Sequence, residues 1–94
     1  MLDLKGEWTL ITGASSGIGY EMAKILASQG HSLVLAGHDE ERLYGIAREL
    51  NELSDIIVMT LDLSTPGSTS LLFEECGRIG LKIGRFINNP GTDN

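Results

Sequence analysis

Residues 8–19 decide the fold, and they read Trp-Thr-Leu-Ile-Thr-Gly-Ala-Ser-Ser-Gly-Ile-Gly. The first five of them, Trp8 to Thr12, form an apolar and partly β-branched run, which is typical of a strand buried on both faces. Three glycines follow, at positions 13, 17 and 19. The apolar residues that then recur at helical spacing are Ile18, Met22, Ile25 and Leu26. This stretch therefore predicts a strand, a tight loop and a helix.

The three glycines of the loop indicate a binding site. Gly13 allows a backbone angle that other residues avoid, and Gly17 lets a bulky group approach the backbone. Gly19, one turn into the helix, allows close packing of helix and strand. The start of such a helix presents unpaired N–H groups and the positive end of the helix dipole to the loop. We therefore expect the loop to bind a phosphate or a pyrophosphate.

Composition limits the class of protein. With 94 residues, 41% of them hydrophobic, the chain is predicted to form one ordered domain. Its net charge of -6 argues against a nucleic-acid or anionic-membrane partner. A single cysteine, Cys76, forms no internal disulfide and fits a reducing compartment. The first residues lack the apolar core of a signal peptide, and no apolar run approaches about 18 residues. We expect a cytoplasmic protein.

Three further strands and two helices are predicted after the first helix. The strands are expected at Leu33–Ala36, Ile56–Thr60 and Arg85–Asn89. The second helix, about Glu40 to Leu53, follows Asp39 as its N-cap. Its apolar stripe contains Leu43, Ile46, Ala47, Leu50 and Leu53. The third helix is expected to begin with Thr65 as N-cap and Pro66 at its first position. Its predicted buried residues are Leu72, Phe73, Cys76 and Ile79.

Four alternations of strand and helix, joined by short connections, predict an α/β fold with a parallel sheet. Right-handed crossovers in a doubly wound arrangement give the strand order 3-2-1-4, with the glycine loop at the switch point between strands 1 and 4. Helices one and two then cover one face, and helix three covers the other. Strand 4 has no neighbour on its outer side, so the doubly wound fold is incomplete.

Three motifs resemble those of the short-chain dehydrogenase/reductase family. Residues 12–19, Thr-Gly-Ala-Ser-Ser-Gly-Ile-Gly, are similar to its TGxxxGxG cofactor motif, which differs from the generic GxGxxG and from the TGxxGxxG of the extended branch. Asp62, followed by Leu63, occupies the position that accepts a hydrogen bond from the adenine amino group. Residues 88–91, Asn-Asn-Pro-Gly, resemble the NNAG motif, with Pro90 in place of the usual alanine. Proline removes an N–H and restricts the residue before it.

The resemblance implies a Rossmann-like fold and an oxidoreductase that uses NAD(P)(H) on an alcohol/carbonyl pair. It assigns the dinucleotide to Gly13, Ser15, Ser16, Gly17, Ile18, Gly19, His38, Asp62, Leu63, Asn89 and Gly91. It also implies a homo-oligomer for the complete protein. No metal site is assigned.

The catalytic residues of the family are absent from these 94 residues. Hydride transfer there depends on a Ser, a Tyr-x-x-x-Lys pair and an Asn that all lie downstream of strand 4. Residues 20–24 spell Tyr-x-x-x-Lys, but they lie in the first helix, where we expect an ordinary helix face. Residues 1–94 are therefore expected to be the N-terminal, cofactor-binding half of a truncated domain, inactive alone.

The end of the second strand bears on the choice between NAD(H) and NADP(H). An acidic residue there binds the ribose 2′-hydroxyl of NAD, whereas a basic residue meets the 2′-phosphate of NADP. Gly37 holds the position of the acid and His38 that of the usual arginine. The hydroxyls of Ser15 and Ser16 also favour NADP(H), whereas Asp39 and a mostly neutral His38 do not. We favour NADP(H) slightly.

Two other functions fit the sequence. The chain could be a stand-alone module that binds a dinucleotide or another protein without catalysis. It could also be a structural remnant that pairs the open edge of strand 4 with another chain.

Overall fold

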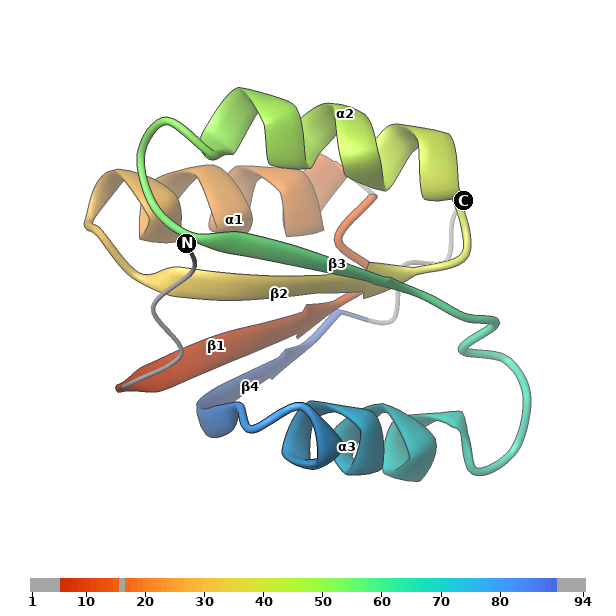
Figure 1. Ribbon diagram of the computed structural model, residues 1–94. Coiled ribbons are helices and arrows are strands. Elements are labelled where there is room, and N and C mark those ends of the chain that lie inside the picture. The colour runs from red at the N-terminus through yellow and green to blue at the C-terminus, as the bar shows by residue number, and fades with distance from the viewer. Residues whose placement is uncertain (1–5, 16, 90–94) are drawn as a thin grey trace.

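The computed structural model describes residues 6–15 and 17–89. Strands and helices alternate along the chain, which confirms the predicted α/β class (Figure 1). The elements are β1 (Glu7–Thr12), α1 (Gly17–Ser28), β2 (Ser32–Gly37), α2 (Glu40–Leu50), β3 (Ile56–Thr60), α3 (Ser68–Arg78) and β4 (Lys82–Asn88). Within the described ranges, no helix combines the length and the apolar character needed to cross a membrane.

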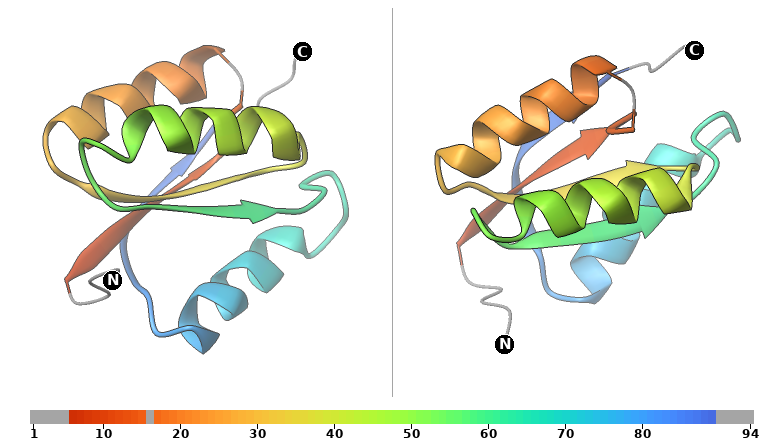
Figure 2. Two further views of the ribbon diagram at one scale, coloured as in Figure 1. Left: turned by 45° about the horizontal axis from the view of Figure 1, so that its top comes forward. Right: turned by 90° about the horizontal axis from the view of Figure 1, so that it is seen from above.

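The four strands form one parallel sheet in the order β3-β2-β1-β4, as predicted. Leu10 in β1 lies opposite Val34 in β2 and Phe86 in β4. Helices α1 and α2 lie side by side over one face of the sheet, and α3 covers the other (Figures 1 and 2). β1 is therefore a central strand, and its carboxyl end leads into the glycine loop.

The core has two parts, one on each face of the sheet. Alternate residues of β1 and β2 point to opposite faces, so both strands are apolar along most of their length. The buried cluster under α1 and α2 contains Ile11, Ala14, Ala23, Leu26, Ala27, Leu33, Leu35, Leu43, Ile46 and Leu50. The cluster under α3 contains Trp8, Leu10, Val34, Ala36, Leu72, Cys76 and Leu81.

The large apolar residues of α1 are not the ones that its buried face contains. Ile18 and Ile25 are 69% and 55% exposed. The residues that face the sheet are Gly19, Ala23, Leu26 and Ala27. Small side chains at these positions let the helix axis come close to the sheet, and the long side chains then lie at the sides of the helix. The apolar spacing correctly predicted a helix, but it did not identify which face of the helix packs on the sheet.

The predicted end of the second helix was wrong by one turn. α2 ends at Leu50, which is 1% exposed, whereas Leu53 is 50% exposed. Residues 51–53 form a turn after the helix, so the apolar spacing continues without the helix that would bury Leu53.

The predicted start of the third helix was also wrong. α3 begins at Ser68, and its N-cap is Gly67, whose φ of 83° is left-handed. Thr65 and Pro66 lie in the preceding turn, where the Thr65 N–H donates to the Asp62 carbonyl at 3.2 Å. The hydrogen bonds of this turn replace the expected side-chain cap.

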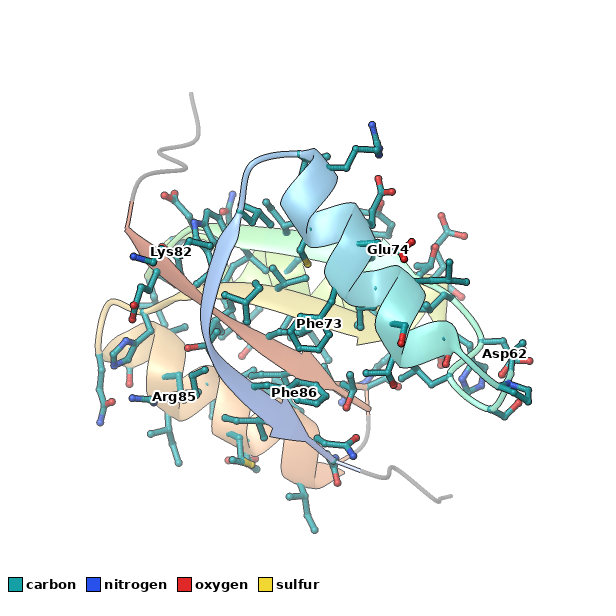
Figure 3. All side chains as sticks on the ribbon, turned by 90° about the horizontal axis from the view of Figure 1, so that it is seen from below. Asp62, Phe73, Glu74, Lys82, Arg85 and Phe86 are labelled. Atoms are coloured by element: carbon teal, nitrogen blue, oxygen red, sulfur yellow. The ribbon has the colours of Figure 1, made fainter. Side chains whose placement is uncertain are left out.

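Two predicted core residues of the third helix are not fully buried. Phe73 is 38% exposed and packs edge-to-face on Phe86 of β4, with ring centroids 5.1 Å apart (Figure 3). Ile79 follows the helix and is half-buried. β4 begins at Lys82, before the predicted Arg85. Both aromatic rings lie beside the outermost strand, where no further strand of the described chain covers them.

Leu50 and Leu53 provide a direct test of where the second helix ends. Leu50→Ala is expected to lower the free energy of unfolding by about 2–5 kcal/mol, because it opens a cavity under α2. Leu53→Ala is the matched control and should change it by less than about 0.5 kcal/mol. Urea denaturation followed by circular dichroism measures both. Equal losses would place Leu53 in the core and contradict the helix end.

Candidate cofactor-binding site

The residues predicted to bind the cofactor gather at the carboxyl edge of the sheet. The glycine loop follows β1, His38 follows β2, Asp62 follows β3 and Asn89 follows β4. Because all four strands are parallel, these four segments meet at the same edge. The first turns of α1 and α2 lie at this edge as well (Figures 1 and 2). In α/β sheets, ligands bind at this edge, beside the point where the strand order reverses.

Two glycines shape the loop in the way the sequence predicted. Gly13 has a φ of 66°, a left-handed angle that other residues adopt at a cost. A Cβ on Gly19 would lie 2.4 Å from the Gly13 carbonyl oxygen and 2.9 Å from the Ala14 Cα. Ala14 is fully buried, and its N–H donates to the Ala36 carbonyl at 3.4 Å. The close contact is thus between the helix and the loop backbone directly after β1.

Asparagines at the end of β4 hold this loop in place. The Thr12 hydroxyl donates to the Asn88 side-chain oxygen at 2.8 Å. The Asn89 side-chain amide donates to the Gly13 carbonyl at 3.1 Å, and the Asn89 N–H donates to the Thr12 carbonyl at 3.3 Å. These bonds join segments that lie 76 residues apart in the sequence. Asn89 therefore stabilises the loop whose shape the site requires.

The start of α1 is open to solvent. A Cβ on Gly17 would meet no atom within 4 Å, and both Gly17 and Ile18 are exposed. No acidic residue lies in the first turn of α1, so no carboxylate of that turn offsets the positive end of the helix dipole. An open helix start that follows a glycine-rich loop fits a phosphate group.

The end of β2 offers space and an exposed imidazole. A Cβ on Gly37 would lie 3.5 Å from Leu43 Cδ1 and 3.8 Å from the Ser15 hydroxyl oxygen, which are ordinary contacts. His38 is exposed. The Asp39 carboxylate accepts a hydrogen bond from the Arg42 N–H at 3.1 Å, which confirms the predicted N-cap of α2. Asp39 thus has a structural role in α2.

Asp62 is an exposed hydrogen-bond acceptor at the end of β3. Its carboxylate accepts from the Ser64 hydroxyl at 2.6 Å and from the Ser64 N–H at 3.0 Å. These two bonds, followed by the charge of His38, hold the pKa of Asp62 below its ordinary value. The carboxylate is therefore ionised at neutral pH. Leu63 beside it packs against the core cluster under α3.

The Tyr-x-x-x-Lys sequence in α1 has a structural role. The Tyr20 hydroxyl donates to the Glu49 carboxylate of α2 at 2.6 Å, and this bond raises the pKa of Tyr20. A tyrosine that acts as a general acid/base near neutral pH needs the opposite shift. The Lys24 ammonium lies 5.2 Å from the ring centroid and the Arg42 guanidinium carbon lies 5.3 Å from it. Tyr20 thus joins α1 to α2, in agreement with the ordinary helix face expected from its position.

Sequence reasoning missed one charged residue near the site. Arg42 lies in the first turn of α2, three residues after its cap. From the sequence, Arg42 is recognised only as a polar residue near the start of a helix. Its contact with Tyr20 is what places its guanidinium at the first turn of α1. Ser16, Pro90 and Gly91, which belong to the predicted motifs, lie outside the described residues. Among the residues described, no group of three or more His, Cys, Asp or Glu side chains could hold a metal ion.

The parallel sheet in the order β3-β2-β1-β4, covered by helices on both faces, is a Rossmann-like fold. The family model described as short chain dehydrogenase matches residues 7–94. The chain therefore belongs to the short-chain dehydrogenase family.

Known proteins similar to this chain are longer than it is. It is 47% identical over 92 residues to an uncharacterized oxidoreductase of Staphylococcus haemolyticus, covering 98% of this chain and 39% of that protein. A short-chain dehydrogenase from Sphingobium yanoikuyae, solved in complex with NADPH, matches with a TM-score of 0.74 and 35% identity, over 86% of this chain and 32% of that one. L-Sorbose reductase from Gluconobacter frateurii, complexed with NADPH and L-sorbose, matches with a TM-score of 0.82 and 29% identity, over 99% of this chain and 37% of that one.

Gly19 and Gly17 differ in the space around them, and substitution tests this difference. Gly19→Ala is expected to lower the free energy of unfolding by about 1–3 kcal/mol, because the new methyl group overlaps the loop backbone. Gly17→Ala is the matched control and should not destabilise the chain, since its methyl group enters open space and alanine favours a helix. Urea denaturation compares the two. A harmless Gly19→Ala would contradict the close contact.

Proposed function

We propose that residues 1–94 form the N-terminal part of a larger dinucleotide-binding domain and hold the adenosine and diphosphate half of NAD(P)(H). The observation that carries this proposal is the open start of α1 behind Gly17, with the loop before it held by Gly19 and Asn89. The first turn of a helix points its N–H groups away from the helix body, and the helix dipole favours an anion there. The backbone amides and the dipole of α1 would bind the diphosphate.

The other predicted residues have roles around the adenosine. The ionised Asp62 carboxylate would accept a hydrogen bond from the adenine amino group, which carries only donors. Ser15 and His38 would border the ribose, because both lie beside Gly37 at the end of β2. Ser16, Leu63 and Gly91 complete the site that the family resemblance implies.

The complete protein is proposed to be an oxidoreductase acting on an alcohol/carbonyl pair. The nicotinamide of the bound cofactor supplies or takes the hydride. The Ser and the Tyr-x-x-x-Lys pair that the resemblance requires would lie downstream of residues 1–94, so this chain alone would bind and orient the cofactor without turnover. Family membership and the longer oxidoreductase relatives support this view. We also propose that the complete protein is cytoplasmic and forms a homo-oligomer.

NADP(H) is the favoured cofactor. No acidic side chain stands at Gly37, and the Asp39 carboxylate accepts the capping bond of α2. Two of the similar solved proteins were determined with NADPH, which supports the same choice. The adenosine half alone distinguishes the cofactors, so ADP-ribose and 2′-phospho-ADP-ribose are suitable probes for this chain.

The glycine loop is tested with Gly17→Val. The branched side chain would occupy the open space at the start of α1, so the affinity for ADP-ribose should fall at least tenfold, equivalent to about 1.4 kcal/mol. Gly77→Val, in the exposed part of α3, is the control and should leave the affinity unchanged. Isothermal titration calorimetry of the 94-residue chain measures both. The loop assignment fails if Gly17→Val binds as tightly as the parent chain.

Cofactor preference is tested with Gly37→Asp. A Cβ at position 37 would make only ordinary contacts, the nearest 3.5 Å from Leu43 Cδ1. A carboxylate there would repel a 2′-phosphate and accept a bond from a 2′-hydroxyl. The ratio of affinities for 2′-phospho-ADP-ribose and ADP-ribose should fall by about tenfold or more. Gly37→Asn, of nearly the same size but uncharged, should change the ratio much less. A ratio that is the same in both variants would show that the 2′-group does not lie at Gly37.

A further inference from the structure

A guanidinium lies between the first turns of α1 and α2. We propose that Arg42, held against the ring of Tyr20, is the residue that recognises the 2′-phosphate of NADP(H). This inference rests on the proposed function, because it concerns the same adenosine-binding site. The sequence suggested only His38 as the residue that recognises the 2′-phosphate, and the inference assigns this role to Arg42.

The position of Arg42 follows from its neighbours. Its N–H bonds to the Asp39 carboxylate, so it belongs to the first turn of α2, directly behind His38. Helical side chains lean toward the N-terminus of their helix, which here is the end of β2. The guanidinium carbon lies 5.3 Å from the ring centroid of Tyr20, the residue after Gly19. The backbone of Arg42 therefore lies close to the end of β2, and its guanidinium lies against Tyr20 in the first turn of α1.

The donors of Arg42 are available to a ligand. Arg42 is exposed, and within the described part of the chain its guanidinium forms neither a hydrogen bond nor an ion pair. Two carboxylates around Arg42 and Tyr20 have other partners: Asp39 accepts from the backbone, and Glu49 accepts from the Tyr20 hydroxyl. The second cation on the ring, Lys24, is 3.8 Å from the Glu21 carboxylate.

The chemistry of the guanidinium suits a phosphate. Its five N–H donors form a rigid fork that matches two phosphate oxygens, and it stays charged at every physiological pH. His38 is an exposed imidazole, which lacks the planar fork of donors that matches two phosphate oxygens. Glu40 and Glu41, also in the first turn of α2, oppose an anion. Because of these acidic neighbours, a constant positive charge is needed for a 2′-phosphate to bind well.

Tyr20 acts here as a positioning residue. Its hydroxyl is anchored on Glu49, and its ring provides the face on which the guanidinium lies. A cation within about 6 Å of a ring centroid is attracted to the ring, so the contact limits the positions that Arg42 samples. Tyr20 would therefore affect the 2′-phosphate only through Arg42.

The test measures two ligands on each variant by calorimetry of the 94-residue chain. Arg42→Gln should weaken 2′-phospho-ADP-ribose at least tenfold, about 1.4 kcal/mol, and leave ADP-ribose within about twofold. Arg48→Gln, an exposed arginine in the last turn of the same helix, is the control and should change neither. Tyr20→Phe keeps the ring and should preserve the ratio of affinities, whereas Tyr20→Leu should lower it.

The outcomes separate this inference from the function on which it rests. If the parent chain binds neither ligand, both are overturned. If it binds ADP-ribose and Arg42→Gln leaves the ratio of affinities unchanged, only the role of Arg42 is overturned. The same conclusion follows if His38→Gln removes the whole preference while Arg42→Gln leaves it intact. Retained ADP-ribose binding in Arg42→Gln also shows that the variant is folded.

Discussion

The contact between Gly19 and the Gly13 carbonyl is the constraint on which the site depends. A side chain at position 19 would overlap the backbone of the loop, so α1 can begin directly behind β1 only because position 19 lacks a Cβ. The Asn89 side-chain amide donates to the same carbonyl, and its nitrogen would lie 3.0 Å from a Cβ on Gly19. Together they fix the direction of α1, and the direction of α1 decides where the N–H groups of its first turn point. The open space at Gly17 exists because of that arrangement.

The same requirement for close approach explains the composition of α1. The helix packs on the sheet through small residues, among them Ala23 and Ala27, rather than through its isoleucines. Ile18 and Ile25 remain exposed on the flanks, and Phe73 and Phe86 lie beside the outermost strand on the opposite face. Solvent thus reaches apolar side chains of α1, α3 and β4. This fits a chain that spans between 26% and 43% of the length of its curated relatives.

Tyr20 shows why a short motif has meaning only at its place in the fold. Its spacing from Lys24 is that of a catalytic pair, yet its hydroxyl bonds a carboxylate that raises its pKa. The contact joins two helices that are consecutive in the fold and brings a charge from α2 toward the glycine loop. The sequence suggested His38 for that region because His38 is adjacent to the strand. Arg42 approaches the region only after both helices have packed.

The sequence by itself determined the order of elements, the parallel sheet and the edge of the sheet where the candidate site is expected. These follow from local chemistry: apolar strands, a glycine loop, Asp39 as a cap, and parallel strands whose carboxyl ends must share one edge. Only the tertiary structure decided which face of α1 is buried, that Gly67 rather than Thr65 caps α3, and that Asn89 bonds a carbonyl 76 residues away. Contacts of this kind depend on distances between elements that are remote along the chain. The pattern of neighbouring residues in the sequence does not specify these distances.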